Sequence, residues 1–166
     1  MSERERRCAF RCFLAILFAA RLASADPAAE IDGAKVVTFK LLSSFTYEPP
    51  DEELTEPPKV PYPPEVLALE GQRVALRGYT LPMDFDQKGI SSFFLMVRPD
   101  QGCCFGSGLA MTDWVDVRWK GKALFDMDMS RPVVVIGTFS VRPHLEGGQI
   151  GSLYRMDGEA IQKAAE

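Results

Sequence analysis

The sequence has few of the side chains on which most enzymes depend. Its 166 residues include one histidine, His144, and four cysteines, and no Gly-x-Ser-x-Gly motif stands on a strand-to-helix turn. Gly106-Ser-Gly108 lies in a glycine-rich loop with no histidine near it in the sequence, so nucleophilic hydrolysis has no support. The Cys-x-x-Cys motif of thiol oxidoreductases is also missing. The sequence therefore favours a protein without enzymatic activity.

No apolar run is long enough to span a bilayer, which needs about 20 residues. The longest unbroken run, Cys12 to Ala20, has nine residues. It follows an arginine-rich start and precedes the small-x-small tripeptide Ala23-Ser24-Ala25, which is the pattern of a secretory signal cleaved before Asp26. We expect residues 1–25 to be a signal peptide and the mature protein to be periplasmic or secreted. Because no cysteine follows the small residues, we expect no lipid attachment and no stable membrane anchor.

Basic side chains are scarce in the expected mature protein. The signal would remove five of the 19 lysines and arginines and two of the 23 aspartates and glutamates. That leaves 14 basic and 21 acidic side chains, a formal charge of −7, which repels a phosphate backbone. We therefore expect no nucleic-acid partner. The remaining length, about 140 residues, is typical of one domain.

Residues 26–64 form an N-terminal segment that is rich in proline. A short strand or edge segment is predicted at Val36 to Phe45 from its apolar and β-branched residues. Tyr47 to Pro64 follows with seven prolines, which exclude a central strand and a helix interior. We expect an extended strap lying over the following domain. The alternative is a docking site for a proline-reading domain.

Residues 65–166 carry the pattern of a small barrel. Alternating or continuously apolar runs predict five strands, at residues 73–81, 91–98, 114–119, 132–141 and 150–156. Val74-x-Leu76-x-Gly78 and Val133-x-Val135-x-Gly137 share one pattern, in which the glycine marks a bulge or a sharp coil. Asp157 to Ala165 is predicted to be a helix capped by Asp157.

The predicted fold class is mainly β. We expect a small five-stranded antiparallel barrel of the oligonucleotide/oligosaccharide-binding (OB) type, with the proline-rich N-terminal strap and a short C-terminal helix. A small β-sandwich is the alternative. The barrel is favoured because the strands at 73–81 and 132–141 each have a glycine at the point where a barrel strand must bend sharply to pair with strands on both of its sides.

Cys103 and Cys104 are the only cysteines of the expected mature chain, in an exported and oxidising compartment. One interpretation is that the two thiols, or a disulfide between them, only shape the loop. A second is a soft-metal site for Cu(I) or Zn(II), with sulfur from Met127 and Met129 nearby. A third is thiol redox chemistry. Closed zinc sites usually need four Cys or His ligands, and His144 is expected at the surface.

Two further groups of residues have weaker functional readings. The spacing of the loop carboxylates does not match that of a calcium-binding loop. We expect them to lie in solvated turns; they are Asp84, Asp86, Asp126, Asp128 and Asp157. Four aromatic residues could form a face on which the bases of a single-stranded nucleic acid stack. In an acidic protein, we expect them instead to pack in the core or to contact another protein; they are Tyr79, Phe105, Trp114 and Trp119.

Three stretches resemble an uncharacterised family of exported bacterial proteins, a domain of unknown function with an OB-like barrel. They are Leu69 to Met83, Phe93 to Val97 and the Cys103-Cys-Phe-Gly106 loop. The resemblance runs from about Phe39 to Met156. Relatives often have a Cys-x-His pair in the central loop, but Phe105 stands at the third position here, so the resemblance does not imply a Cys/His metal site in this chain. Some relatives are encoded beside transport systems for metal supply.

These observations lead to one main functional hypothesis. It is an exported, non-enzymatic binding or accessory module, linked to metal handling through the Cys103-Cys104 loop. Its partner would be a protein, with an envelope transport system as the candidate. The alternative is an exported thiol-redox protein that uses Cys103 and Cys104, and a third hypothesis is a purely structural interaction protein.

Overall fold

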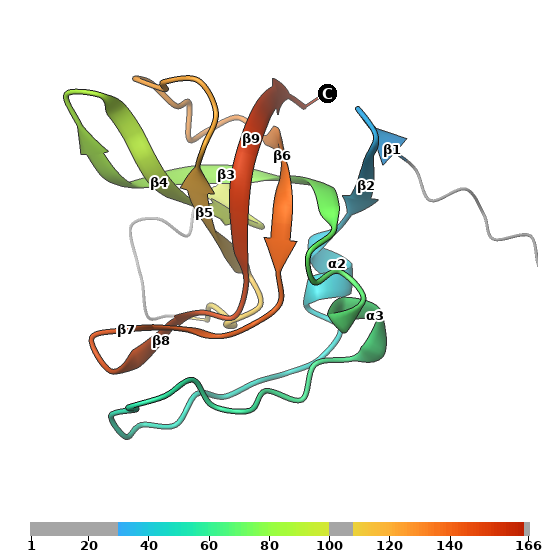
Figure 1. The fold of residues 1–166 in the computed structure, drawn as a ribbon, viewed down its shortest axis with the longest axis vertical. Coiled ribbons are helices and arrows are strands. Elements are labelled where there is room, and N and C mark those ends of the chain that lie inside the picture. Colours follow the sequence, from blue (N-terminus) through green and yellow to red (C-terminus); the bar gives the residue numbers. More distant parts are fainter. Residues whose placement is uncertain (1–29, 100–107, 165–166) are drawn as a thin grey trace, which may run out of the picture.

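The computed structural model describes residues 30–99 and 108–164 (Figure 1). Nine strands and two short helices are described in these ranges. They are β1 (Glu30–Ile31), β2 (Ala34–Val37), α2 (Phe39–Leu42), α3 (Pro64–Leu67), β3 (Arg73–Asp86), β4 (Gly89–Met96), β5 (Trp114–Trp119), β6 (Val133–Ser140), β7 (His144–Glu146), β8 (Gln149–Ser152) and β9 (Arg155–Lys163). The predicted signal peptide and the Cys103-Cys104 pair lie outside the described residues.

Five strands close into a barrel. The sheet runs β3-β4-β5-β9-β6, and β6 pairs again with β3, while β1 and β2 extend the sheet from β3 (Figure 1). The mainly β fold and the five-stranded barrel are therefore confirmed. The purely antiparallel arrangement is wrong, because β5 and β9 are parallel, as are β2 and β3. The connection between β5 and β9 contains β6, β7 and β8, and parallel pairing requires a long crossover connection of this kind.

The predicted C-terminal helix is wrong. Residues 155–163 form β9, which lies between β5 and β6 and pairs with both. The predicted strand at 150–156 is correspondingly split between β8 and the start of β9. The residues from 157 onward have helix-forming side chains, but they complete the barrel, and in a helix the facing backbone groups of β5 and β6 would lose their partners. Tertiary pairing outweighs local propensity here.

The N-terminal segment also departs from its prediction. A short strand or edge segment is predicted at Val36 to Phe45, but only Val36 and Val37 belong to a strand, because β2 ends at Val37 and the helical turn α2 follows. Phe39 and Leu42 are three residues apart, so one turn of helix places both on the same face, and both are buried. This burial explains why the chain turns away from the sheet at this point.

β3 is longer than the predicted strand at 73–81 and runs on through Pro82. β3 continues to Asp86 and keeps pairing with β4, with irregular register on either side of Asp84. The pairing of β3 with β6 stops at Gly78, opposite Val133. Beyond that point β3 has only one neighbour, and a proline is tolerated in such an edge segment.

Both strand glycines lie where the backbone of another strand comes close. The β6–β9 register shifts between Ile136 and Gly137, but the extra residue is Glu159 of β9, so the bulge lies in the neighbouring strand and not at Gly137 as predicted. A Cβ at Gly137 would overlap the carbonyl oxygen of Asp157, so glycine is required there by the close approach of β9. At Gly78 a Cβ would lie 2.7 Å from the Met96 carbonyl oxygen, so the reason for glycine is close backbone approach. Gly78 is also the residue at which β3 changes partner from β6 to β4.

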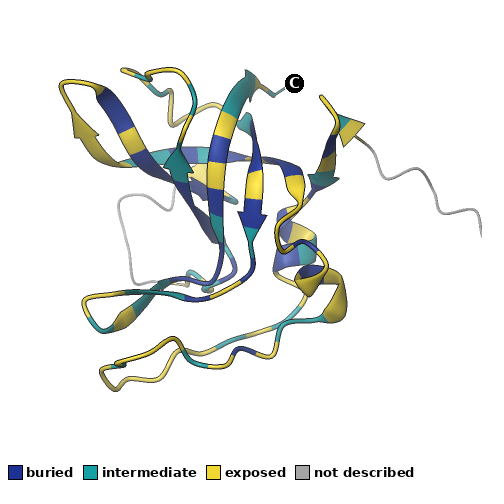
Figure 2. Ribbon diagram, viewed as in Figure 1, coloured by how far each residue is buried: buried dark blue, intermediate teal, exposed yellow. Residues whose placement is uncertain are grey.

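One main hydrophobic core fills the barrel, and the proline-rich strap packs against it (Figure 2). Val60 of the strap is buried in this core, and no helix or strand lies between Tyr47 and Pro63. The Tyr62 hydroxyl donates to the Leu153 carbonyl at 2.8 Å. The Tyr154 hydroxyl donates to the Leu42 carbonyl at 2.8 Å and is itself buried. These contacts hold the N-terminal segment against the β8–β9 turn.

In the described part of the chain, no helix has the length and apolar character needed to cross a membrane.

Candidate functional site

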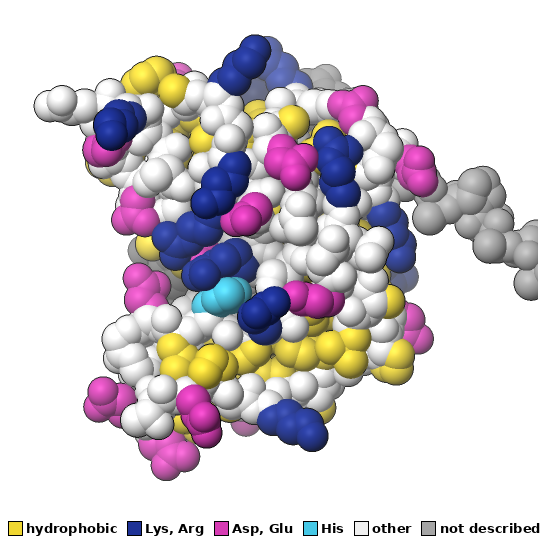
Figure 3. Space-filling view, in the orientation of Figure 1, with side chains coloured by type: hydrophobic (Ala, Val, Ile, Leu, Met, Phe, Trp, Pro, Cys, Tyr) yellow, Lys and Arg dark blue, Asp and Glu magenta, His cyan; other side chains and the backbone are white. Residues whose placement is uncertain are grey.

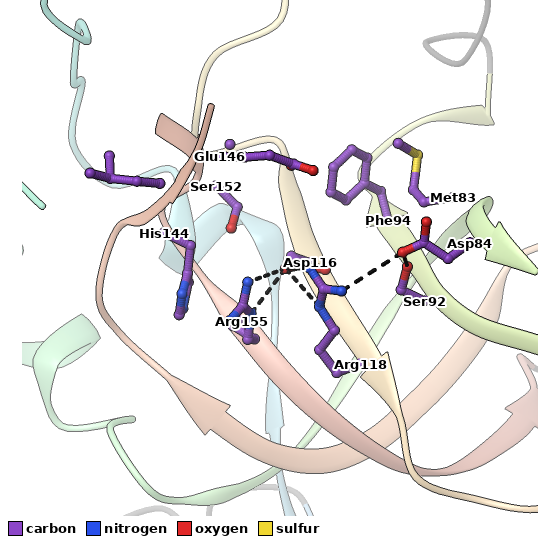
Figure 4. Close-up of a pocket in the computed structure, with 12 residues that line it drawn as sticks. Met83, Asp84, Ser92, Phe94, Asp116, Arg118, His144, Glu146, Ser152 and Arg155 are labelled. Atoms are coloured by element: carbon purple, nitrogen blue, oxygen red, sulfur yellow. Dashed lines mark hydrogen bonds and ion pairs between the residues drawn. The ribbon is translucent and has the colours of Figure 1, made fainter. Parts of the chain in front are cut away.

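A polar pocket of about 220 Å³ lies on the outside of the barrel, over β4 and β5 and beside the β7–β8 hairpin (Figure 4). We call it the outer pocket. Its lining comes from β3, β4, β5, the hairpin and β9, and consists of Met83, Asp84, Ser92, Phe94, Asp116, Arg118, His144, Leu145, Glu146, Gly151, Ser152 and Arg155. Segments far apart in the sequence therefore meet at this site.

Strand alternation decides which side chains face the outer pocket. In β5, Val115 and Val117 are buried in the barrel core, so Asp116 and Arg118 point to the opposite face. In β4, Phe93 is likewise in the core, and its neighbours point outward. Phe94, Asp116 and Arg155 then form one cross-strand row, because they are register partners across β4, β5 and β9.

Asp116 is the centre of the charge network in this pocket. Its side chain is only 8% exposed, and its Oδ2 atom accepts hydrogen bonds from two guanidinium groups. Arg155 donates from Nε at 2.9 Å and from Nη2 at 2.8 Å, and Arg118 donates from the same two atoms at 3.3 and 3.2 Å. A buried carboxylate needs such partners, since an uncompensated charge away from water is costly.

Asp84 extends the network to the β3–β4 hairpin. Its Oδ2 atom accepts a hydrogen bond from Ser92 Oγ at 2.6 Å and lies 3.8 Å from Arg118 Nη1 (Figure 4). The chain of charges thus reads Asp84, Arg118, Asp116, Arg155, with acidic and basic groups alternating. No strong local excess of either charge results.

The β7–β8 hairpin forms the rim of the pocket. Trp114 of β5 is buried and donates from its indole nitrogen to the Gly151 carbonyl at 3.0 Å, which fixes β8 above β5. His144 and Ser152 are register partners in the hairpin, so both are carried to the same edge of the pocket.

His144 is half-buried rather than a plain surface residue, which corrects the expectation from the sequence. Burial is the main cause that lowers the pKa of its imidazole below 6.5, and the nearby Arg155 guanidinium lowers it further. Arg142 and Arg118 act in the same direction, whereas Asp116 raises the pKa. Figure 3 shows the single histidine among basic side chains on this face of the molecule. The imidazole is therefore held in its neutral form at neutral pH.

Two polar atoms of the pocket are buried without a hydrogen-bond partner among the described residues. They are Oγ of Ser152, a residue only 1% exposed, and Nε2 of His144. Buried polar groups in folded proteins are almost always paired, so an unpaired hydroxyl and an unpaired imidazole nitrogen at one cavity indicate a site that a bound molecule completes.

The structure places the predicted site residues elsewhere or leaves them undescribed. Cys103 and Cys104 lie outside the described residues. Met127 is half-buried and Met129 is half-exposed, and both line a concavity with the exposed Phe125 that shares no described residue with the outer pocket. Within residues 30–99 and 108–164, no three His, Cys, Asp or Glu side chains cluster in a way that would hold a metal ion.

The residues of the outer pocket were largely missed from the sequence. Trp114-Val-Asp-Val-Arg-Trp119 alternates, and this alternation was the signal that Asp116 and Arg118 share one polar face of a strand. Arg155 and Ser152 gave no such signal, because their place at the pocket depends on the pairing of β9 with β5 and on the hairpin. Asp84 was singled out, but as a solvated turn residue.

Together, fold and site define a small mixed β-barrel with a polar pocket on its outer face. The chain is similar to a DUF3299 family protein from Pseudomonas aeruginosa PAO1, known from a crystal structure, with 18% sequence identity and a TM-score of 0.54. The similarity covers 80% of this chain and 97% of that one, and at this identity it concerns the fold alone. The fold neighbour belongs to an uncharacterised domain family, which is consistent with the resemblance seen in the sequence.

A second similar structure is a Leishmania major Friedlin protein provisionally assigned as an aspartyl-tRNA synthetase. It has 12% identity and a TM-score of 0.42 over 98% of this chain and 26% of that one, which is too low a structural similarity to support an argument. No protein-family model matches the chain, and no curated protein sequence matches it.

Proposed function

We propose that this protein is an exported, OB-like binding module whose outer pocket takes a small, uncharged, hydroxylated ligand, such as one sugar ring of a glycan. The single observation that carries the proposal is a pair of polar atoms, Ser152 Oγ and His144 Nε2, that have no hydrogen-bond partner in the described part of the chain and lie in a cavity built from alternating charged groups.

The barrel topology supports the OB-like part of the proposal. OB barrels bind oligonucleotides and oligosaccharides on the face of their second and third strands and between the loops that follow strands one and four. The corresponding strands here are β4 and β5. The β7–β8 hairpin stands in the connection between the fourth and fifth barrel strands, β6 and β9. In an OB-like barrel this is the position where ligands bind, which supports a binding role for the outer pocket.

The charges of the pocket favour an uncharged ligand. The lining has three acidic side chains, from Asp84, Asp116 and Glu146, and two basic ones, from Arg118 and Arg155. An ion of either sign would therefore meet groups of its own charge. A hydroxyl group both donates and accepts hydrogen bonds, so it can bond a carboxylate and a guanidinium at once. The neutral His144 imidazole and the Ser152 hydroxyl add one further donor or acceptor each.

The size and the apolar part of the pocket point to one small unit. Its volume of about 220 Å³ is below the roughly 300–1,000 Å³ of sites for drug-sized molecules. Phe94 and Met83 form an apolar side of the lining, against which the carbon face of a sugar ring can pack. A nucleic acid is disfavoured by the acidic chain, which has a formal net charge of −4.

Calorimetric titration tests the proposal with glucose, N-acetylglucosamine and their disaccharides against the protein and two variants. Ser152→Ala should weaken binding by about tenfold, the scale of one lost hydrogen bond to a buried partner. The matched control is Ser44→Ala, because Ser44 is exposed on the N-terminal segment. Glucose 6-phosphate and gluconate serve as charged comparisons. Tighter binding of either charged sugar, or equal loss in both serine variants, would contradict the proposal.

The cysteine hypotheses rest on different evidence from the proposal for the outer pocket. Metal handling and thiol redox are proposed from the sequence of the Cys103-Cys104 loop, which lies outside the described residues, and among the described residues Met127 and Met129 do not line the outer pocket. Export likewise rests on the signal-peptide pattern of residues 1–25. Mass spectrometry of the protein from its native compartment tests export directly, since a mature chain that begins at Asp26 is expected.

A further inference from the structure

A second, larger cavity of about 840 Å³ lies at the end of the barrel where β6 begins and β9 ends. We call it the end cavity. It shares no described lining residue with the outer pocket, and its volume is within the range of sites for small organic ligands. Its lining is Arg77, Tyr79, Thr80, Leu124, Asp126, Met127, Asp128, Arg131, Pro132, Val133, Ile161, Lys163 and Ala164.

The body of the end cavity is apolar. Val133 and Ile161 pack against the barrel core from β6 and β9, and Leu124 and Met127 pack against it from the connection between β5 and β6. In the β6–β9 register, Ile161 lies opposite the buried Val135 and Lys163 opposite Val133. Residues two apart in a strand share a face, so Lys163 continues the inward row of Ile161 at the end of the barrel.

One buried polar group in this cavity has no partner. Thr80 of β3 is 3% exposed, and its Oγ1 atom makes no hydrogen bond within the part of the chain described. Thr80 lies two residues after Gly78, which pairs with Val133, so its side chain belongs to the same inward face. A buried hydroxyl without a partner costs stability, and a ligand atom that reaches it removes this cost.

The charged groups of the end cavity have a positive excess in an acidic protein. Three basic side chains, Arg77, Arg131 and Lys163, face two acidic ones, Asp126 and Asp128, a balance of +1 where the whole chain has −4. Asp128 is already engaged, because it accepts hydrogen bonds from the amide and hydroxyl of Ser130 and lies 3.5 Å from Arg131 Nε.

Arg77 and Lys163 are available for a ligand. Among the ion pairs of the described residues, none involves either side chain. Both side chains are exposed, and the more buried part of the cavity lining is apolar. A cationic mouth above an apolar body matches a molecule with a negative head and an apolar body.

We propose that the end cavity binds an organic acid with an apolar body and a second polar atom at its buried end. The carboxylate pairs with Lys163 and Arg77, the body packs on Val133 and Ile161, and the polar atom bonds the Thr80 hydroxyl. This site is distinct from the outer pocket and does not depend on the function proposed for it.

Calorimetry with three ten-carbon probes tests the proposal: 10-hydroxydecanoate, decanoate and decyltrimethylammonium. The hydroxy acid should bind about tenfold more tightly than decanoate, because only the hydroxy acid has an atom that can bond Thr80. The cationic probe should bind least, since its head meets basic side chains. Equal binding of all three probes would overturn the proposal, because the end cavity would then recognise only an apolar chain.

Two variants separate the parts of the site, with a third as control and a fourth in reserve. Lys163→Met keeps the apolar stem and removes the charge, and should weaken the binding of both acids by about tenfold. Thr80→Val keeps the shape of the side chain and should abolish the preference for the hydroxy acid without weakening decanoate. Lys35→Met, on the exposed side of β2, is the matched control. Arg77→Gln replaces Lys163→Met should that variant fail to fold, as judged by urea unfolding. The proposal would be overturned if the control Lys35→Met weakened acid binding as much as Lys163→Met does. The same holds for Arg77→Gln where it is used in place of Lys163→Met.

Discussion

Asp116 and Arg155 lie opposite each other in the parallel pairing of β5 and β9, and two nitrogens of Arg155 bond the same oxygen of Asp116 at 2.9 and 2.8 Å. The contact joins the third and fifth strands of the barrel, which are separated in the sequence by β6 and the β7–β8 hairpin. A polar contact at the outer pocket therefore also secures the one parallel pairing that the described residues place within the barrel.

Asp116→Asn should lower the free energy of unfolding by about 2 kcal/mol. Removing one partner of a fully buried ion pair costs roughly 3–5 kcal/mol, and the loss is smaller here because Arg118 and Arg155 are 40% and 31% exposed and can regain water. The control is Asp157→Asn, an exposed carboxylate of β9, with an expected change within about 0.5 kcal/mol. Urea unfolding measures both, and equal losses would contradict the structural role of Asp116.

Tyr154→Phe should lower the free energy of unfolding by about 1–2 kcal/mol. The buried Tyr154 hydroxyl donates to the Leu42 carbonyl, and its removal leaves that carbonyl without this partner. Tyr79→Phe is the matched control, because Tyr79 is half-buried and its hydroxyl makes no hydrogen bond within the described residues. Hydrogen exchange should also show faster exchange in α2 for Tyr154→Phe only. Unchanged exchange in α2 would mean that this contact does not hold the N-terminal segment.

Gly137→Ala should destabilise the barrel by about 3 kcal/mol, the upper part of the usual range for overpacking. The added Cβ would overlap the Asp157 carbonyl oxygen, a backbone atom that cannot rotate away. In Gly151→Ala the nearest atom would be Oε2 of Glu146 at 3.2 Å, which belongs to a flexible side chain. Thermal unfolding should therefore separate the two variants clearly. Similar melting temperatures for both would show that the β9 backbone opposite Gly137 adapts to a side chain.

The stability of the protein should fall as the pH is lowered through 6.5, partly because of His144. Burial and the neighbouring arginines lower the pKa of His144 in the folded state, whereas the unfolded chain keeps a value near 6.5. Below pH 6.5 His144 is protonated in the unfolded chain but remains neutral in the folded protein. The contribution of His144 to the free energy of unfolding, which is present above pH 6.5, is therefore lost as the pH falls toward the pKa of the folded state. His144→Asn should lose less stability than the native protein between pH 8 and pH 5.5 in urea titrations. Parallel losses would contradict a neutral His144.

The Cys103-Cys104 loop remains a predicted soft-metal site. Replacement of both cysteines by serine should abolish tight Cu(I) binding in a competitive titration, because thiolates are the preferred ligands of this ion. Met127→Leu with Met129→Leu tests the weaker sulfur ligands and should reduce affinity only modestly. Unchanged affinity in the double serine variant would remove the metal hypothesis, and a redox-inert pair in a dithiol–disulfide assay would remove the redox alternative.

The sequence by itself determined the barrel strands with strong local patterns. Alternation in Trp114 to Trp119 and the β-branched run at Val133 to Ser140 predicted β5 and β6, because each signal is local to one strand. The mainly β fold and the closed barrel followed from the number and spacing of these strands.

Tertiary structure alone decided the C-terminal strand and the outer pocket. Residues 155–163 have helix-forming side chains, yet they become β9 because β5 and β6 offer backbone partners on both sides. That pairing sets Arg155 beside Asp116, and the Trp114–Gly151 hydrogen bond sets the hairpin above them. Neither relationship has a local signature, since each joins residues 37 or more positions apart and depends on register across strands.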